Sequence, residues 1–305
     1  MDKPLIITGC TSTGKSMLAL ELSKIRSSKI VNADAMQVYN CWRILSARPN
    51  EADNLTVPHK LYGHKDFNFN YSVGTWLKEI KEELNNFDKR RPIIVGGTGL
   101  YLSCLLNGLT SIPRISMTVK NESKQLASSN PKFMKDYLYQ YDRKTYNYID
   151  VNNSVRVARA YEVLKETGIG FRTWLEKKTD PVLKIEDCDL LILNAETDWL
   201  NNRINVRFNS MLANGAIEEV RKIYESGWDS NLPAAKAIGA NEIIDYLRGK
   251  KTLEEAKAYA IIRTRQYAKR QRTWFRNRFQ KWKKLTLNKD TDFKAIAQEI
   301  EENLS

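Results

Sequence analysis

Short apolar runs and helical patterns alternate through the first third of the chain. Three apolar runs predict strands, at 4–8, 29–34 and 91–97. Two segments between them have the period of a helix, 16–25 and 72–87, and Ser72 is the predicted N-cap of the second. Strands separated by helices are typical of a parallel sheet with helices on both faces.

The pattern changes about a third of the way along the chain. Residues 114–185 lack apolar strand runs and have a polar, helical pattern, which predicts a helical insertion. An apolar run at 188–196 predicts a further strand of the sheet, and the chain from Asp198 is predicted to be helical almost to its end. We therefore expect a core made of 1–113 and 186–305, interrupted by the insertion.

Composition narrows the class of protein. The chain has 305 residues, of which 42% are hydrophobic, and this excludes a wholly disordered protein. No apolar stretch approaches the roughly 18 residues that span a bilayer, and the first run is too short for a signal peptide. We therefore expect a cytoplasmic protein with no membrane partner.

The four cysteines form no C-x-x-C pair, and two histidines alone predict no metal site. A net charge of +13 favours a polyanionic partner.

Residues 9–16, GCTSTGKS, match the phosphate-binding pattern G-x-x-x-x-G-K-[ST]. The pattern lies between a predicted strand and a predicted helix, which is the context it requires. Gly9 and Gly14 allow a tight turn that points successive N–H groups into one concavity, where the helix dipole favours an anion. Lys15 can reach an outer phosphate, and the Ser16 hydroxyl can bind Mg²⁺. The sequence therefore predicts a phosphate site, without indicating the reaction.

Two polar side chains follow the predicted strands on either side of the chain's second helix. Asp34 ends the run at 29–34, and Thr98 follows two glycines at the end of the run at 91–97. Because the carboxyl ends of parallel strands meet at one edge of a sheet, we expect both near the phosphate loop. Three roles fit the Asp34 carboxylate: a magnesium ligand, a general base, or a cap of the next helix. For Thr98, a substrate contact and a plain helix cap fit equally well.

The segment 263–284 is predicted to be one helix with ten basic residues and no acidic one. Solvated helix faces usually mix both signs, because Glu–Lys pairs support the helix. Five aromatic residues are interleaved at helical spacing, partly for the core and partly as platforms on which bases stack. This combination favours nucleic acid over a membrane surface. Two smaller basic pairs lie elsewhere, Arg156 with Arg159 and Arg203 with Arg207.

Taken in order, eight motifs resemble the tRNA dimethylallyltransferase family. They are GCTSTGKS, NADAMQVY, VPHKL, PIIVGGTGLYL, RVARAYEV, RINVRFNSML, LPAAKAIGANEII and TRQYAKRQRTWFRNR. The phosphate-binding pattern alone is shared by many NTPases. Its ordered combination with the last motif is specific, and the resemblance runs from residue 4 to about residue 280.

The resemblance implies an α/β fold: a P-loop NTPase-like parallel sheet flanked by helices, with a helical insertion domain and a helical C-terminal region. It implies transfer of a dimethylallyl group from dimethylallyl diphosphate to N6 of the adenosine 3′ of the anticodon. Mg²⁺ is the implied cofactor, and the tRNA anticodon stem-loop is the implied partner, gripped in part by the insertion. We expect a monomer.

The resemblance also assigns roles to individual residues. The catalytic residues are Asp34 as general base, Thr98 at the reacting centre and Arg207 near the diphosphate. The donor-binding residues are Gly9, Thr11, Ser12, Thr13, Gly14, Lys15, Ser16 and Arg203, with Ser16 also the metal ligand. The tRNA-binding residues are Asp34, Ala35, Met36, Gln37, Arg156, Arg159, Lys236, Arg265, Gln266, Lys269, Arg270 and Arg272.

Four positions depart from the family pattern: Ala35, Gly63, Val155 and Ala240. None of them is a predicted catalytic residue, so we expect the chemistry to survive and the affinity or selectivity for tRNA to change. Three other functions fit parts of the chain. A small-molecule P-loop kinase and a free-nucleotide isopentenyltransferase leave the basic segment near the C-terminus unexplained. A non-catalytic RNA-binding protein leaves Asp34 and Thr98 without a role.

Overall fold

The structure is a computed structural model that describes residues 3–86 and 92–304. Phe87 and Arg91, the ends of two predicted elements, lie outside the described residues. The chain forms two compact units, the first made of residues 1–106 and 182–305 and the second of residues 107–181.

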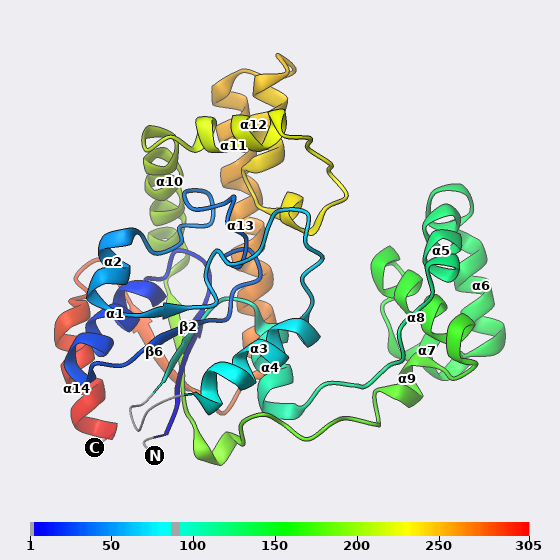
Figure 1. Ribbon diagram of the computed structural model, residues 1–305, viewed down its shortest axis with the longest axis horizontal. Coiled ribbons are helices and arrows are strands. Elements are labelled where there is room, and N and C mark those ends of the chain that lie inside the picture. The colour runs from blue at the N-terminus through cyan, green and yellow to red at the C-terminus, as the bar shows by residue number, and fades with distance from the viewer. Residues whose placement is uncertain (1–2, 87–91, 305) are drawn as a thin grey trace. The chain divides into compact units, whose positions relative to one another are not determined.

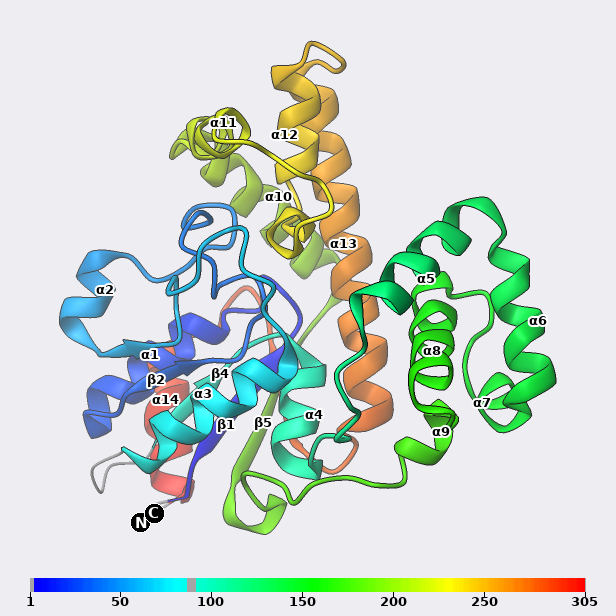
Figure 2. The ribbon, with the colours of Figure 1, turned by 45° about the vertical axis from the view of Figure 1, so that its right-hand side comes forward.

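The first unit is built on a parallel sheet (Figures 1 and 2). Its strands, as far as the structure describes the chain, are β1 (Leu5–Gly9), β2 (Ile30–Asn32), β3 (His59–Lys60), β4 (Ile93–Val95), β5 (Asp189–Ala195) and β6 (Lys283–Leu287). They lie in the order β3-β2-β4-β1-β5-β6, and every neighbouring pair is parallel. The predicted α/β fold class and the strands predicted within the first third and at 188–196 are confirmed.

Helices cover both faces of this sheet. On one face lie α1 (Lys15–Arg26) and α14 (Phe293–Leu304), and on the other lie α3 (Val73–Asn85), α4 (Gly99–Asn107) and α13 (Leu253–Arg278). The unit also contains α2 (Glu51–Thr56), α10 (Thr197–Ala213), α11 (Ala216–Glu225) and α12 (Ala240–Leu247). Two short 3₁₀ turns accompany them, at Ile185–Asp187 and Pro233–Lys236. The hydroxyl of Ser72 accepts the N–H of Thr75 at 3.1 Å, so the predicted N-cap of α3 is confirmed.

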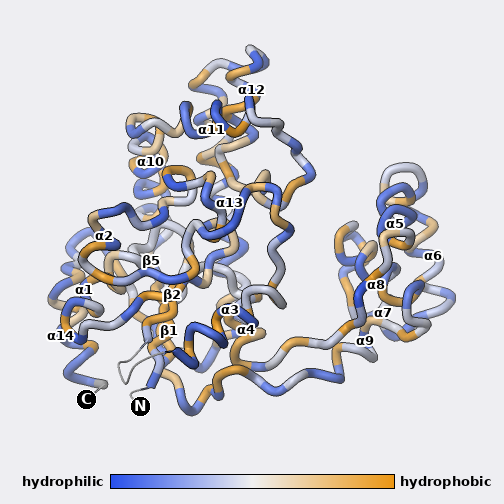
Figure 3. The backbone as a smooth tube through the Cα atoms, in the orientation of Figure 1, coloured by the Kyte–Doolittle hydropathy of each residue, from blue (hydrophilic) through white to orange (hydrophobic). Residues whose placement is uncertain are grey.

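Alternate residues of the strands enter two separate cores. On one face, Ile6, Ile94 and Ile192 pack with residues of α3, α4 and α13. On the other face, Ile7 and Leu193 pack with residues of α1 and α14. This alternation is the period of a strand buried on both sides. Figure 3 shows the hydrophobic colour along β1 and β2.

The helix predicted at 263–284 is shorter than expected. The helix α13 ends at Arg278, and residues 283–287 form β6 instead, paired with β5 from Leu191↔Lys283 to Ala195↔Leu287. The aromatic spacing that suggested a longer helix continues past its end. Phe279 and Trp282 are buried and stacked with ring centroids 4.0 Å apart, in the turn that leads to the strand.

The second unit is a small helical bundle. Its helices are α5 (Met117–Ser129), α6 (Pro131–Tyr141), α7 (Arg143–Tyr148), α8 (Ser154–Thr167) and α9 (Phe171–Trp174). They share their own core, in which Met134, Leu138, Val157 and Tyr161 are buried. The polar, helical pattern predicted for the insertion is therefore what this part of the chain forms. Within the described residues of both units, no helix is long and apolar enough to cross a membrane.

Candidate active site

The loop between β1 and α1 has the backbone of a phosphate cradle. Gly9 and Gly14 have φ angles of 152° and 97°, in the region that favours glycine. A Cβ on Gly9 would lie 2.5 Å from the carbonyl oxygen of Leu193, and one on Gly14 would lie 2.4 Å from the ring of Phe293. Gly14 is also the N-cap of α1 and has no side chain to cap the first N–H groups of the helix. These N–H groups are thus available to an anion.

Polar groups of the loop also suit a phosphate. Lys15 Nζ donates to the carbonyl oxygens of Gly9 at 2.9 Å and Cys10 at 2.7 Å. The Ser12 hydroxyl is buried and has no hydrogen-bond partner among the described residues. A buried hydroxyl without a hydrogen-bond partner lowers the stability of the fold. An oxyanion that accepts a hydrogen bond from this hydroxyl would therefore stabilise the loop. Arg203 Nε donates to the Ser12 carbonyl oxygen at 2.8 Å and so borders the same cradle.

Asp34 and Thr98 meet at the carboxyl ends of β2 and β4, as the sequence predicts. Thr98 Oγ1 accepts the N–H of Ala35 at 2.9 Å, and Asp34 Oδ1 accepts the N–H of Met36 at 2.9 Å. A Cβ on Gly96 would lie 2.1 Å from the backbone of Ala33, so this glycine lets the two strand ends approach. No helix begins at Asp34, because the residues after it form turns, and its role as a helix cap is excluded.

The carboxylate lies within the electrostatic reach of two cations. Burial lowers the pKa of Lys15 to about 8; the negative charge of Asp34 opposes this shift and the positive charge of Arg207 adds to it. Burial also lowers the pKa of Arg207, whereas the negative charge of Asp34 raises it. The three side chains therefore occupy one site, although Arg207 comes from α10 and is remote from the other two in sequence.

Gln271 is a site residue that the sequence did not reveal. Its Oε1 accepts the N–H of Thr11 at 2.8 Å, and its Nε2 donates to the carbonyl oxygen of Gly97 at 2.9 Å. The side chain is buried in the middle of the basic stretch of α13. A usable signal was its spacing from the buried residues Ala268 and Phe275, which places all three on one helix face.

The predicted tRNA-binding residues of α13 divide into two groups. Gln266, Lys269 and Arg270 are exposed. Arg265 and Arg272 are half-buried and held by neutral groups, the Asn205 side chain at 3.1 Å and the Thr197 hydroxyl at 2.7 Å respectively. The predicted binding role of all five stays a prediction.

Other predicted tRNA contacts lie on loops and on the second unit. Gln37 Nε2 donates to the carbonyl oxygens of Ser46 at 2.9 Å and Ala47 at 3.1 Å, so its amide already fastens a loop. The remaining positions differ in their exposure: Lys236 and Arg156 are exposed, Arg159 lies 3.5 Å from Glu162, and Ala35 and Met36 are partly buried against the core. Arg156 and Arg159 belong to α8 of the second unit.

Two of the departures from the family pattern have a structural reason. A Cβ on Gly63 would lie 1.1 Å from Nη1 of Arg48, so the guanidinium fills the place of a side chain there. Ala240 is fully buried at the start of α12. Val155 is 77% exposed on α8, where nothing in the structure explains its identity.

Comparison with known proteins supplies the family. A model described as "IPP transferase" matches residues 37–278, and one described as "Isopentenyl transferase" matches residues 3–63. The chain belongs to the IPP transferase family. Within this family, a tRNA dimethylallyltransferase of Cereibacter sphaeroides is 47% identical over 94% of this chain and 90% of that protein. A tRNA dimethylallyltransferase of a Ruegeria species is 43% identical over 93% and 96%.

Solved structures of the family share the fold. The tRNA isopentenylpyrophosphate transferase of Bacillus halodurans is 31% identical, with a TM-score of 0.68 over 100% of this chain and 97% of that one. A eukaryotic dimethylallyltransferase described as acting on tRNA is 25% identical, with a TM-score of 0.84 over 99% of this chain and 78% of that one. The protein is therefore a transferase of the IPP transferase family, as its motifs predict.

Proposed function

We propose that this protein transfers the dimethylallyl group of dimethylallyl diphosphate to N6 of the adenosine 3′ of the anticodon in tRNA. The names of its relatives support this activity. The observation that carries the proposal for this chain is the meeting of a phosphate cradle, the Asp34 carboxylate and the Arg207 guanidinium in one site. A small-molecule kinase would not need the exposed cations that follow on α13.

The phosphate cradle would bind the diphosphate of the donor. Its N–H groups, the hydroxyl of Ser12 and the cations Lys15 and Arg203 offer hydrogen bonds and charge to phosphate oxygens. The remaining loop residues, Gly9, Thr11, Thr13 and Gly14, shape the backbone. Lys15 would exchange its two carbonyl partners for the phosphates. The negative phosphates would raise the pKa of Lys15, which burial lowers, and so keep the lysine charged.

A Mg²⁺ ion fits the Ser16 position. The hydroxyl is exposed in the first turn of α1, beside the cradle. The described residues contain no group of three or more His, Cys, Asp and Glu side chains suited to a metal. A single hydroxyl suits Mg²⁺, which takes its other ligands from substrate phosphates and water. When bound, the ion would neutralise part of the charge on the diphosphate.

Asp34 would act as the general base. The exocyclic amine of adenine is a weak nucleophile, so its proton must be accepted as the new C–N bond forms. The C–O bond of the donor breaks as the C–N bond forms, and the diphosphate leaves with its negative charge met by Lys15, Arg203 and Arg207. The N–H of Ala35 donates a hydrogen bond to Thr98 Oγ1 and so holds Thr98 beside Asp34. The hydroxyl of Thr98 can still donate its own proton in a hydrogen bond to the reacting groups.

The tRNA would lie along exposed cations. Gln266, Lys269 and Arg270 are available on α13, and Arg156 is available on the second unit. Cations contribute to RNA affinity mainly through phosphate contacts, while the target base must leave its stack to reach Asp34. The monomeric state and a cytoplasmic location stay predictions.

The proposed function is tested by one incubation with Mg²⁺, radiolabelled dimethylallyl diphosphate and unmodified tRNA. AMP and ATP are offered separately as alternative substrates. Label in tRNA is the expected result, and its loss on mutation of the target adenosine would locate the reaction. Label in AMP instead would indicate a free-nucleotide enzyme, and hydrolysis of ATP without transfer would indicate a kinase or another NTPase.

A further inference from the structure

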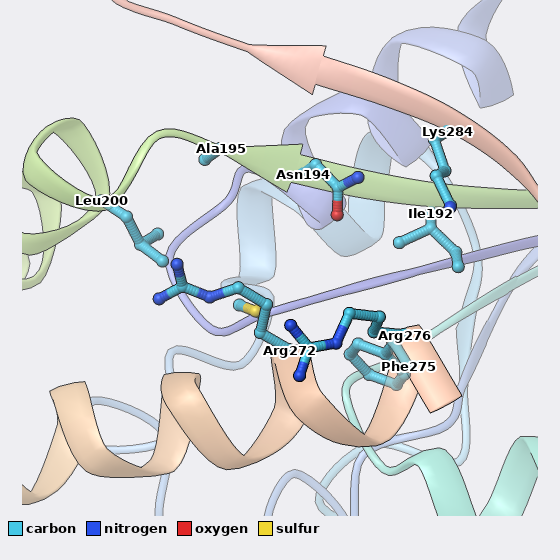
Figure 4. Close-up of a pocket in the computed structure, with 9 residues that line it drawn as sticks. Ile192, Asn194, Ala195, Leu200, Arg272, Phe275, Arg276 and Lys284 are labelled. Atoms are coloured by element: carbon cyan, nitrogen blue, oxygen red, sulfur yellow. The ribbon is translucent and has the colours of Figure 1, made fainter. Parts of the chain in front are cut away.

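A cavity of about 250 Å³ lies beside the phosphate cradle (Figure 4). Its walls come from the loop after β1, from β5, β6 and α13, and from the start of α10. The residues that line it are Cys10, Ile192, Asn194, Ala195, Leu200, Arg272, Phe275, Arg276 and Lys284. Cys10 is part of the cradle, so the two spaces share a wall.

The cavity is positively charged. Arg272 and Arg276 lie one turn apart on α13, and Lys284 stands opposite on β6, while none of the nine lining residues is acidic. Arg272 donates to the neutral hydroxyl of Thr197 at 2.7 Å. Its charge also reaches the cradle, where it opposes the rise that burial causes in the pKa of the Cys10 thiol. Three cations around one small space repel one another unless an anion joins them.

The floor of the cavity is apolar. Ile192, Leu200 and Phe275 are buried there, whereas Arg276 and Lys284 are exposed at its mouth. Lys284 pairs in register with Ile192, so both side chains lie on the sheet face that α13 covers. This arrangement, with charge at the rim and hydrocarbon below, suits a small anion that carries an apolar group. An RNA backbone would meet only the rim.

We propose that this cavity binds the diphosphate group of a small molecule, as a second anion site beside the phosphate cradle. The ligand is a diphosphate, either free or bearing a short apolar chain. This inference rests on the proposed function, because that reaction uses the second of these compounds and releases the first. The cavity would then hold the diphosphate as it enters or leaves the cradle through the side that Cys10 borders.

The test measures binding of inorganic diphosphate with Mg²⁺ to the full-length protein by titration calorimetry, without tRNA. The wild type is expected to bind at two sites. The double variant Arg276→Gln/Lys284→Gln should lose one, with an affinity at least about tenfold weaker there, because two charge-assisted contacts are removed. Lys15→Ala should lose the other. Lys283→Gln is the control for the strand position: it removes one positive charge next to Lys284, from a side chain that faces the opposite side of the sheet.

Two results would overturn the proposal. One is a double variant that binds diphosphate with wild-type stoichiometry and affinity. The other is a double variant whose only change is a flatter salt dependence of tRNA binding, which would make the rim an RNA contact. Repeating the titration with dimethylallyl diphosphate identifies the ligand: tighter binding than inorganic diphosphate at the cavity indicates the donor, and weaker binding indicates the product. If the wild type binds diphosphate at both sites but transfers no dimethylallyl group to tRNA, the proposed function is refuted and the proposed cavity site is retained.

Discussion

The side chain of Gln271 donates from Nε2 to the carbonyl oxygen of Gly97 at 2.9 Å while its Oε1 accepts the N–H of Thr11 at 2.8 Å. One buried amide thus joins α13 to the phosphate cradle and to the turn that carries Thr98. The helix with the exposed cations and the predicted donor site are thereby held in one geometry. A Cβ on Gly97 would lie 2.4 Å from the same amide, so the contact also requires glycine.

Replacing Gln271 with Met should disturb the donor site more than RNA binding. Met has a similar length but makes neither hydrogen bond, so the Thr11 N–H and the Gly97 carbonyl lose their partner at a cost of about 1–3 kcal/mol in stability. We expect the KM for the donor to rise, because the cradle loses a support. The Kd for tRNA should stay within about twofold, or about 0.4 kcal/mol, because the available predicted tRNA contacts of α13 are exposed residues. Gln298→Met, an exposed change on α14, is the control for stability. Equal losses for both substrates would reduce Gln271 to a general packing role.

Asp34→Asn should lower turnover by about 10²–10⁴-fold, the usual contribution of a general base. The asparagine Oδ1 can still accept the N–H of Met36, so the turn after β2 is kept while the proton acceptor is removed. The measurement is single-turnover transfer of label to tRNA, with tRNA affinity determined in parallel. Affinity is expected to stay close to that of the wild type. Unchanged turnover would remove Asp34 as the base.

The pKa of Lys15 predicts a pH limit for donor capture. Burial lowers this pKa to about 8, so the free enzyme loses the lysine charge as the pH rises through that value. Because kcat/KM reports groups of the free enzyme, kcat/KM for the donor should fall about tenfold per pH unit above about 8. Lys15→Arg should remove this transition at a lower overall rate, because a guanidinium stays charged there. A transition that persists in the arginine variant would belong to another group.

Reversing two exposed charges of α13 should change the salt dependence of tRNA binding. Lys269→Glu/Arg270→Glu is expected to weaken binding and to flatten the slope of log K against log salt by about 0.7–0.9 for each RNA phosphate that the variant no longer neutralises. The measurement is tRNA affinity at several salt concentrations. Lys289→Glu, at an exposed position between β6 and α14, is the matched control. If the slope matches that of the control, these two residues lie outside the RNA interface.

Much of the site could be predicted from the sequence because its signals are local. The phosphate pattern, the apolar runs before Asp34 and Thr98, and the Ser72 cap each depend on residues within one strand, turn or helix. Parallel pairing then required the strand ends to meet, and Thr98 Oγ1 does accept the N–H of Ala35. The sequence by itself therefore determined the fold class and which loops form the candidate site.

The tertiary structure decided what depends on partners distant in sequence. Whether residues 283–287 continue a helix or form a strand depends on the exposed edge of β5, and the strand pairing prevails. The spacing of Gln271 places it on the buried face of α13, but its partners are decided only when the cradle and Gly97 are brought against it. The same holds for Arg272, Arg276 and Lys284, whose charges gather around one cavity only after β6 has joined the sheet. Local periodicity indicates which face of a helix or strand is buried, but not which distant residues that face meets, because those contacts are selected by the free energy of packing the whole chain.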